Sequence, residues 1–165
     1  METKRWIKII LVLAVILVNI GCDQASKKIV RQTIAPNETI SLLGDHLTIT
    51  NVENTGAFLS LGDSLPKTVK NILLSLLPFI AIALGLFYVL HKQDLPNLML
   101  AGFCFVIGGG IGNVFDRIVY GSVTDFLHIN FGIFQTGIFN VADLSIMTGV
   151  VIILLQSILK RRNSS

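Results

Sequence analysis

Two aspartates in the C-terminal part of the chain, Asp125 and Asp143, have the residue type that acid–base chemistry needs. Asp143 lies about four residues inside an apolar stretch long enough to span a bilayer, where an acid is costly unless it has a use, and Asp125 lies beyond the end of another such stretch. Two carboxylates that share a poorly hydrated site do not both ionise, so the pair holds a single proton. The ionised acid can take a proton from water while the protonated acid hydrogen-bonds the carbonyl under attack. Such a pair predicts peptide-bond hydrolysis without a metal or a nucleophilic side chain.

Two other interpretations of this pair remain open at the level of the residues. The acids can form a structural pair that is hydrogen-bonded to Arg117 or Asn140, or they can be the proton relay of a small transporter. A liposome pH-flux assay separates the relay from the peptidase. Four spans without an inverted repeat give the transporter little support.

Other short motifs predict no chemistry. Gly108 and Gly112 belong to a glycine-rich run inside an apolar stretch, where small residues four apart favour close helix packing rather than phosphate binding. Ser64 and Lys67 match the S-x-x-K pattern of penicillin-recognising enzymes, but the S-D-N and K-T-G partners of that pattern are missing. The histidines are scattered, so no zinc site is expected. The two cysteines, Cys22 and Cys104, are expected to be packing residues without a disulfide.

The composition fixes the kind of element that must hold these residues. Of the 165 residues, 52% are hydrophobic and 14% are charged, whereas soluble domains carry about 25% charged residues. Two runs of 21 uncharged residues, 71–91 and 95–115, each match the roughly 20 residues of a membrane span. Two shorter runs reach that length only when an end extends past a charge. We therefore predict an all-α membrane protein, one integral membrane domain over residues 1–165, with four transmembrane helices at about 6–25, 70–91, 96–115 and 139–159.

The distribution of Lys and Arg predicts the orientation of these spans. Seven basic residues crowd the N-terminus, the short link 91–95 and the C-terminal tail, whereas six are spread over the long loops at about 26–69 and 116–138. The positive-inside rule then puts both termini in the cytoplasm and both long loops outside. No basic stripe with interleaved aromatic residues is visible, so nucleic-acid binding is not expected.

The outer loops and the N-terminus complete the predicted layout. Residues 40–58 alternate in a strand-like way, which predicts a small extracytoplasmic β-element. Residues 59–69 predict a turn before the second helix, and the apolar loop 118–138 is expected to lie in the membrane interface. Residues 1–22 resemble a lipoprotein signal that ends in Cys22. Because Asn19 stands where Leu is usual and three more spans follow, we interpret this segment as a retained helix.

Five sequence blocks around the polar residues are similar to those of one bacterial family. They are Asp23-Gln24-Ala25-Ser26-Lys27, Asn54-Thr55-Gly56-Ala57-Phe58, Gly112-Asn113-Val114-Phe115-Asp116-Arg117, Val123-Thr124-Asp125-Phe126 and Phe139-Asn140-Val141-Ala142-Asp143. In this order they closely resemble bacterial lipoprotein signal peptidase, also called signal peptidase II. The resemblance implies a four-helix aspartic endopeptidase of the inner membrane, without a cofactor or metal. It would remove the signal peptide of diacylglyceryl-modified prolipoproteins by cutting just before the lipidated cysteine, and globomycin-type inhibitors would block it.

The resemblance also implies roles for individual residues at an active site near the outer face of the membrane. The catalytic pair falls on Asp125 and Asp143. The substrate-binding residues that it implies are Asp23, which closes the pocket, Asn54 and Arg117, which contact the substrate backbone, and Asn113 and Asn140, which line the pocket. Gly56 fits a turn or a close approach of the backbone to a ligand. The expected partners are prolipoprotein substrates and membrane lipids.

Overall fold

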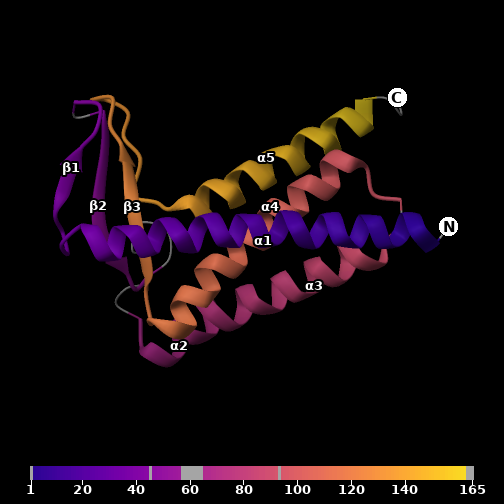
Figure 1. The fold of residues 1–165 in the computed structure, drawn as a ribbon, viewed down its shortest axis with the longest axis horizontal. Coiled ribbons are helices and arrows are strands. Elements are labelled where there is room, and N and C mark those ends of the chain that lie inside the picture. Colours follow the sequence, from indigo (N-terminus) through magenta and orange to yellow (C-terminus); the bar gives the residue numbers. More distant parts are fainter. Residues whose placement is uncertain (1, 45, 57–64, 93, 163–165) are drawn as a thin grey trace.

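The computed structural model describes residues 2–44, 46–56, 65–92 and 94–162. Long helices run along one axis, and a small sheet lies across one end of them (Figure 1). The helices are α1 (Glu2–Thr33), α2 (Lys67–Asn71) continued by a π-helical segment (Ile72–Leu76) and α3 (Leu77–His91), α4 (Asn97–Val119) and α5 (Val141–Arg162). Within the described ranges, four helical stretches are long and apolar enough to cross a membrane. The predicted membrane protein with four spanning helices and a small β-element is confirmed.

The first helix is longer than the sequence predicted. α1 continues to Thr33, past the expected end near residue 25, so the following loop begins later than predicted. Asp23, the charge that suggested an end, lies one turn before Lys27, and the two form an ion pair on the buried side of the helix. A charge that is paired against neighbouring helices does not end a span, whereas a charge that faced lipid would.

A proline explains the π-helical segment between α2 and α3. Pro78 has no backbone N–H, so it cannot donate to the carbonyl of Leu74 four residues earlier. The helical hydrogen bonds shift by one residue at this point, because the N–H of Leu77 donates to the carbonyl of Ile72, five residues earlier. This widened turn lies near the sheet end of these helices (Figure 1). The predicted turn at 59–69 lies largely outside the described residues, but the helix begins directly after Pro66.

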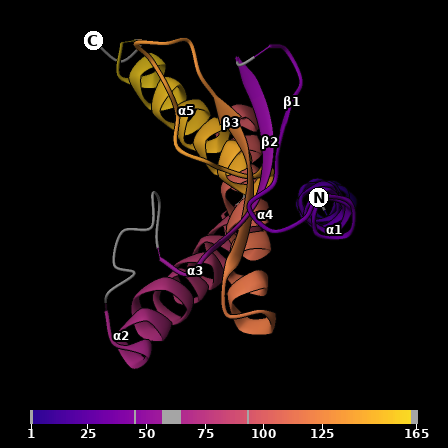
Figure 2. The same cartoon turned by 90° about the vertical axis from the view of Figure 1, so that its left-hand side faces the viewer.

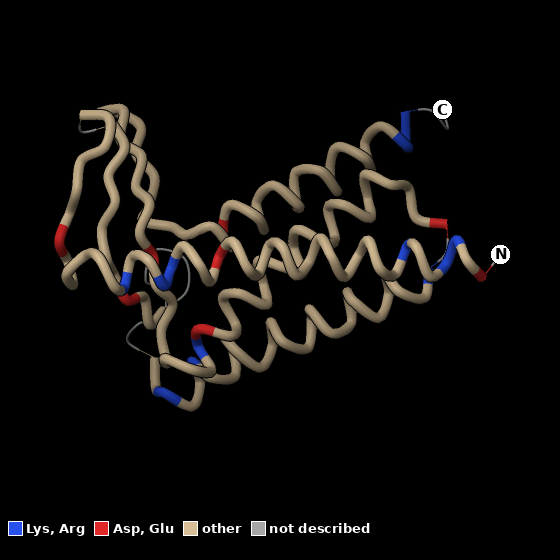
Figure 3. Tube along the Cα trace, in the orientation of Figure 1, with Lys and Arg blue, Asp and Glu red and all other residues tan. Residues whose placement is uncertain are grey.

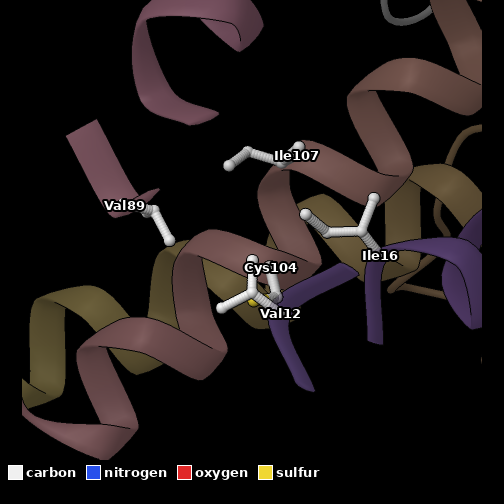
Figure 4. Packing of buried hydrophobic residues seen from close by; sticks show 5 residues of the cluster. All are labelled: Val12, Ile16, Val89, Cys104 and Ile107. Atoms are coloured by element: carbon white, nitrogen blue, oxygen red, sulfur yellow. The ribbon is translucent and has the colours of Figure 1, made fainter. Parts of the chain in front are cut away.

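Helix α4 is the central helix of the bundle and packs against α1, α3 and α5 (Figure 2). Its apolar contact with α1 and α3 is formed by Val12, Ile16, Val89, Cys104 and Ile107 (Figure 4). The glycine run lies where the helices approach most closely. A Cβ at Gly108 would come within 2.7 Å of the Cβ of Asn19, and a Cβ at Gly112 would overlap the carboxylate of Asp23. The interpretation of this run as a packing motif is confirmed.

The sheet is antiparallel and has the strand order β1 (Thr39–Ser41), β2 (Leu47–Asn54) and β3 (Val123–Ile129). The first two strands come from the segment that was predicted to be β. The third corrects the expectation that 118–138 is only an interfacial loop, because β3 pairs with β2 along most of its length. Phe126 of β3 packs on Val30 and Ile34 at the end of α1, so the apolar residues of this segment cover the helix end.

The outer surface of the helices is apolar and the charges gather at the two ends. Large side chains such as Leu17, Phe87 and Leu154 are more than half exposed, as expected for side chains that face lipid. Both termini lie at the end opposite the sheet, and basic residues cluster there (Figure 3). At the other end, acidic and basic residues mix where the helices meet the sheet (Figure 3).

Candidate active site

The two aspartates approach one another from different elements. Asp125 belongs to β3, and Asp143 lies in the first turn of α5 because this helix begins at Val141, two residues later than predicted. Asn140, which is fully buried, bridges them: its Nδ2 donates to Oδ1 of Asp125 at 2.6 Å. On its other side, the backbone N–H of Asp143 donates to Oδ1 of Asn140 at 2.9 Å, and the backbone N–H of Asn140 donates to Oδ2 of Asp143 at 3.2 Å. This reciprocal pattern is a capping box, which explains why the helix starts here.

The environment of Asp125 favours its protonated form. Its side chain is only 4% exposed, and its Oδ2 accepts a hydrogen bond of 2.9 Å from Nδ2 of Asn54. Burial raises the pKa of Asp125 to about 6, and the negative charge of Asp143 acts in the same direction. The amide hydrogen bonds from Asn54 and Asn140, together with the charge of Lys27, oppose this shift in pKa. A carboxyl group tuned in this way can hold a proton near neutral pH.

Asp143 is held by a second amide, whose orientation is fixed by a lysine. Nδ2 of Asn113 donates to Oδ1 of Asp143 at 2.8 Å. On the other end of that amide, Nζ of Lys27 donates to Oδ1 of Asn113 at 2.9 Å. Because an ammonium group only donates, it forces the oxygen of Asn113 toward itself and the NH₂ group toward Asp143. Hydrogen bonds that are donated to a carboxylate stabilise its ionised form.

Lys27 also joins a fully buried ion cluster beneath the two aspartates. Its Nζ lies 2.8 Å from Asp23 and 2.9 Å from Asp116, and all three side chains are fully buried. Oδ1 of Asp23 accepts the backbone N–H of Ala142, in the first turn of α5, at 2.9 Å. Arg31 extends the cluster, with its NH2 atom 3.3 Å from Asp116. The cluster ties α1, α4 and α5 together where Asp143 must be positioned.

Arg117 lies at the edge of the site. Its NH2 atom donates to the carbonyl of Gly56 at 3.2 Å, and the N–H of Gly56 donates to Oδ1 of Asn54 at 2.9 Å. The guanidinium lies within electrostatic reach of Asp143 and Asp125. Its Nε is buried and has no hydrogen-bond partner within the described part of the chain. A donor of this kind is available to the carbonyl of a bound peptide.

Two cavities border these residues. The first, of about 330 Å³, lies between α2 and the end of α4 and is lined by Thr55, Leu65, Lys67, Lys70, Asn71, Leu74, Ser75, Arg117 and Gly121. The second, of about 280 Å³, lies on the sheet side and is lined by Val52, Asn54, Asp125, His128, Thr136, Gly137 and Ile138. In the described ranges, no three His, Cys, Asp or Glu side chains are grouped so that they could hold a metal ion.

The structure brings most of the predicted site residues into one hydrogen-bonded network. Asp125, Asp143, Asn54, Asn113 and Asn140 contact one another directly. Arg117 and Gly56 contact each other at the edge of this network. Asp23 is connected to it through Lys27, which contacts both Asp23 and Asn113. Their individual roles in catalysis and substrate binding stay predictions.

Sequence reasoning did not assign a site role to Lys27 or Asp116. The spacing of Asp23 and Lys27, four residues apart on one helix, was a usable signal, because such a pair can form a salt bridge. Asp116 lies in one of the five family-like blocks, but the sequence did not indicate its partners Lys27 and Arg31, which come from α1.

Comparison with known proteins gives a consistent result over nearly the whole chain. Residues 15–159 match the profile of the family described as signal peptidase (SPase) II. A protein named lipoprotein signal peptidase from Streptococcus pneumoniae is 30% identical over 156 residues, which cover 94% of this chain and 97% of the relative. Another with that name, from Moorella thermoacetica, is 34% identical over 143 residues, which cover 87% and 89% of the two chains.

Solved structures agree on the fold. A bacterial membrane enzyme determined by the in meso method at 2.3 Å resolution superposes with a TM-score of 0.83 at 22% identity, covering 94% of this chain and 92% of the other. A second, at 1.9 Å resolution, gives a TM-score of 0.77 at 23% identity over 88% and 91% of the two chains. The helices and the sheet therefore have the arrangement of known membrane enzymes.

Proposed function

The chain belongs to the lipoprotein signal peptidase family, also called signal peptidase II, and from this premise we propose that it cuts diacylglyceryl-modified prolipoproteins with an aspartate dyad. Removal of signal peptides from prolipoproteins by a membrane peptidase follows from the family. The proposal adds that Asp125 and Asp143 are the catalytic pair and that the bond just before the lipidated cysteine is cut. The single observation that carries it is the contact of Asn140 with both acids: its side-chain amide donates to the carboxylate of Asp125, and its backbone N–H donates to the carboxylate of Asp143.

The surroundings of the two acids favour different roles, with one as the general base and the other as the general acid. In the proposed mechanism Asp143, which is held by hydrogen bonds from Asn113 and from the backbone of Asn140, acts as the base. Asp125, whose pKa is raised to about 6, carries the shared proton. Because the two groups interact, their titration belongs to the pair as a whole.

Hydrolysis then proceeds without a covalent enzyme intermediate. The oxygen of a water molecule bonds to the carbonyl carbon while Asp143 takes one proton of that water, and Asp125 gives its proton to the carbonyl oxygen. In the second step the C–N bond breaks, and the amine of the cysteine takes the proton from Asp143. One hydroxyl of the intermediate returns a proton to Asp125, which leaves a new carboxyl end on the signal peptide and restores the pair.

Arg117, Gly56 and Asn54 are suited to holding an extended peptide beside the dyad. Arg117 has a buried Nε available for a substrate carbonyl, and its contact with Gly56 fixes the guanidinium. Asn54 links that segment to Asp125. Asp23 belongs to the buried ion cluster and accepts the N–H of Ala142, so it helps to position the start of α5, which carries Asp143.

The membrane supplies the second part of the recognition. A signal peptide crosses the bilayer as a helix, and its lipidated cysteine reaches the outer leaflet, where the helices of this protein meet the sheet. The exposed apolar side chains of the helices provide a surface for the acyl chains and for surrounding lipids. In the proposed orientation both termini are cytoplasmic and the active site lies at the outer face of the inner membrane. The basic residues at the end that carries the termini support this (Figure 3).

The function is tested by a gel-shift assay with a purified diacylglyceryl prolipoprotein in detergent. We expect cleavage that survives EDTA and stops with globomycin. Asp125→Asn and Asp143→Asn should each lower the rate at least about a hundredfold, because one positioned acid or base contributes about 10²–10⁴ in rate. Asp94→Asn, on the link at the opposite end of the helices, is the matched control and should cleave like the wild type. Appreciable cleavage by either purified dyad variant would overturn the dyad.

A further inference from the structure

A β-bulge in β3 directly follows Asp125. The backbone N–H groups of Phe126 and Leu127 both donate to the carbonyl of Phe139, at 3.0 and 2.8 Å, and the N–H of Phe139 donates to the carbonyl of Leu127 at 2.9 Å. Two residues of β3 therefore face one residue of the opposing segment, which is the definition of a bulge. A bulge interrupts the alternation of side chains along a strand. This explains how Asp125 and His128, an odd number of residues apart, come to line the same cavity.

That cavity, of about 280 Å³, is lined by His128, whose ring carries a buried polar atom without a partner. The other polar groups that line it are already engaged: Asn54 binds Asp125 and Gly56, and the hydroxyl of Thr136 hydrogen-bonds the backbone of Ile129. Nδ1 of His128 is buried and has no hydrogen-bond partner in the described part of the chain. A buried polar atom left unpaired is unfavourable, so a ligand that satisfies it gains affinity.

The position of the cavity relates it to one side of the scissile bond, and this step rests on the proposed function. Its walls come from β2, β3 and residues 136–138, which belong to the sheet end and not to the membrane-spanning helices (Figure 1). A signal peptide enters from the cytoplasmic side, so the chain that follows the lipidated cysteine continues outward, toward the sheet. The residue directly after the cysteine then lies beside Asp125, where the cavity opens.

We propose that this cavity binds the side chain of the residue that follows the lipidated cysteine, and that His128 selects a hydroxyl-bearing side chain over an aliphatic one of the same shape. A hydroxyl both donates and accepts, so it can pair with Nδ1 of His128 in either tautomer of the ring. The apolar walls, Val52 and Ile138, accommodate the methyl group of a threonine equally well as that of a valine. His128 is thus a specificity-determining residue outside the blocks that the family resemblance covers.

The test uses two diacylglyceryl prolipoprotein substrates that differ only in Thr or Val after the cysteine. For the wild type, we expect kcat/KM to be at least about fivefold higher for the Thr substrate, in line with an unpaired buried polar atom in the Val complex. His128→Phe keeps a ring but removes both nitrogens, and it should bring the ratio to about one. His128→Asn keeps a hydrogen-bonding group near Nδ1 and should retain the preference. Thr48→Val is the matched control, because Thr48 pairs with His128 across the strands and does not line the cavity; it should leave the ratio unchanged.

The outcomes separate this proposal from the function on which it rests. Equal cleavage of both substrates by the wild type, or a full preference for Thr in His128→Phe, overturns the role of His128 and leaves the peptidase activity in place. Failure of the wild type to cleave either substrate overturns the proposed function and the subsite together. A preference that is present in the wild type, lost in His128→Phe and kept in His128→Asn supports the subsite.

Discussion

Replacing Lys27 by Met should destabilise the protein by about 3–5 kcal/mol, the usual effect of removing one partner from a buried ion pair. The Nζ atom lies 2.8 Å from Asp23 and 2.9 Å from both Asp116 and Asn113, and the side chain is fully buried. Met keeps the length of the side chain but leaves two buried carboxylates without this cation. Asp116 retains Arg31 at 3.3 Å, so Asp23 is the carboxylate that suffers most.

This imbalance predicts the order of rescue by second substitutions. Lys27→Met combined with Asp23→Asn should recover more stability than Lys27→Met combined with Asp116→Asn. The coupling energy of each pair follows from a double-mutant cycle. Lys28→Met is the matched control, since Lys28 is the next residue and is exposed; it should change the stability by no more than about 0.5 kcal/mol.

Unfolding can be measured as the reaction of a buried cysteine thiol with a dye. Cys104 is 2% exposed, whereas Cys22 is exposed, so a Cys22→Ser background leaves one buried thiol that reacts with a maleimide dye when the helices separate. The temperature at which the dye reacts in detergent should fall clearly in Lys27→Met. A Lys27→Met protein as stable as Lys28→Met would refute the argument, because it would mean that the buried carboxylates do not depend on this lysine.

Two further predictions follow from the site and its supports. The proposed mechanism needs one proton on the dyad, and burial raises the pKa of Asp125 to about 6, so kcat/KM should fall by up to about tenfold per pH unit above about pH 6. Asn54→Leu removes a hydrogen bond that lowers this pKa, so the fall in kcat/KM should begin at a higher pH. A fall that begins at the same pH in Asn54→Leu would contradict the assignment of the proton to Asp125. Gly112→Ala should lower the stability, because the added Cβ would overlap the Asp23 carboxylate. Gly21→Ala is its control: the added Cβ meets no atom within 4 Å, so the change should be neutral or stabilising by up to about 1 kcal/mol. Equal dye-reaction temperatures for the two variants would contradict the close packing of α4 against Asp23.

The helices could be predicted from the sequence because a bilayer excludes unpaired charge, so charge-free runs mark the spans. Their ends were less predictable, because the rule assumes that a charge faces lipid or water. Asp23 and Lys27 break this assumption: they pair on the protein-facing side of α1, and the helix continues past them. Which side of a helix faces its neighbours depends on packing that one chain's periodicity does not determine.

The third strand escaped prediction for a related reason. Alternation of apolar and polar residues marks a strand with one face exposed to solvent. The first four residues of β3 are all buried, between β2 and the end of α1, so this alternation is missing. Such a segment resembles an apolar loop in the sequence. The acid pair itself was predictable from residue type and family resemblance, whereas its contacts with Asn140, Asn113 and Lys27 required the positions of three helices.

The relative position of Asp125 and Asp143 depends on a very short piece of chain. Phe139 is hydrogen-bonded to β3 at the bulge, and the next residue, Asn140, caps α5 and bridges both acids. The sheet that carries Asp125 and the helix that carries Asp143 are therefore joined through two consecutive residues, while the loop at 130–138 connects them only by a longer route. Residues 131–134 belong to neither set of hydrogen bonds, so a change of length there should leave both sets intact. An insertion between Phe139 and Asn140 would separate the bulge from the helix cap and move one acid relative to the other, so we expect it to abolish cleavage in the gel-shift assay.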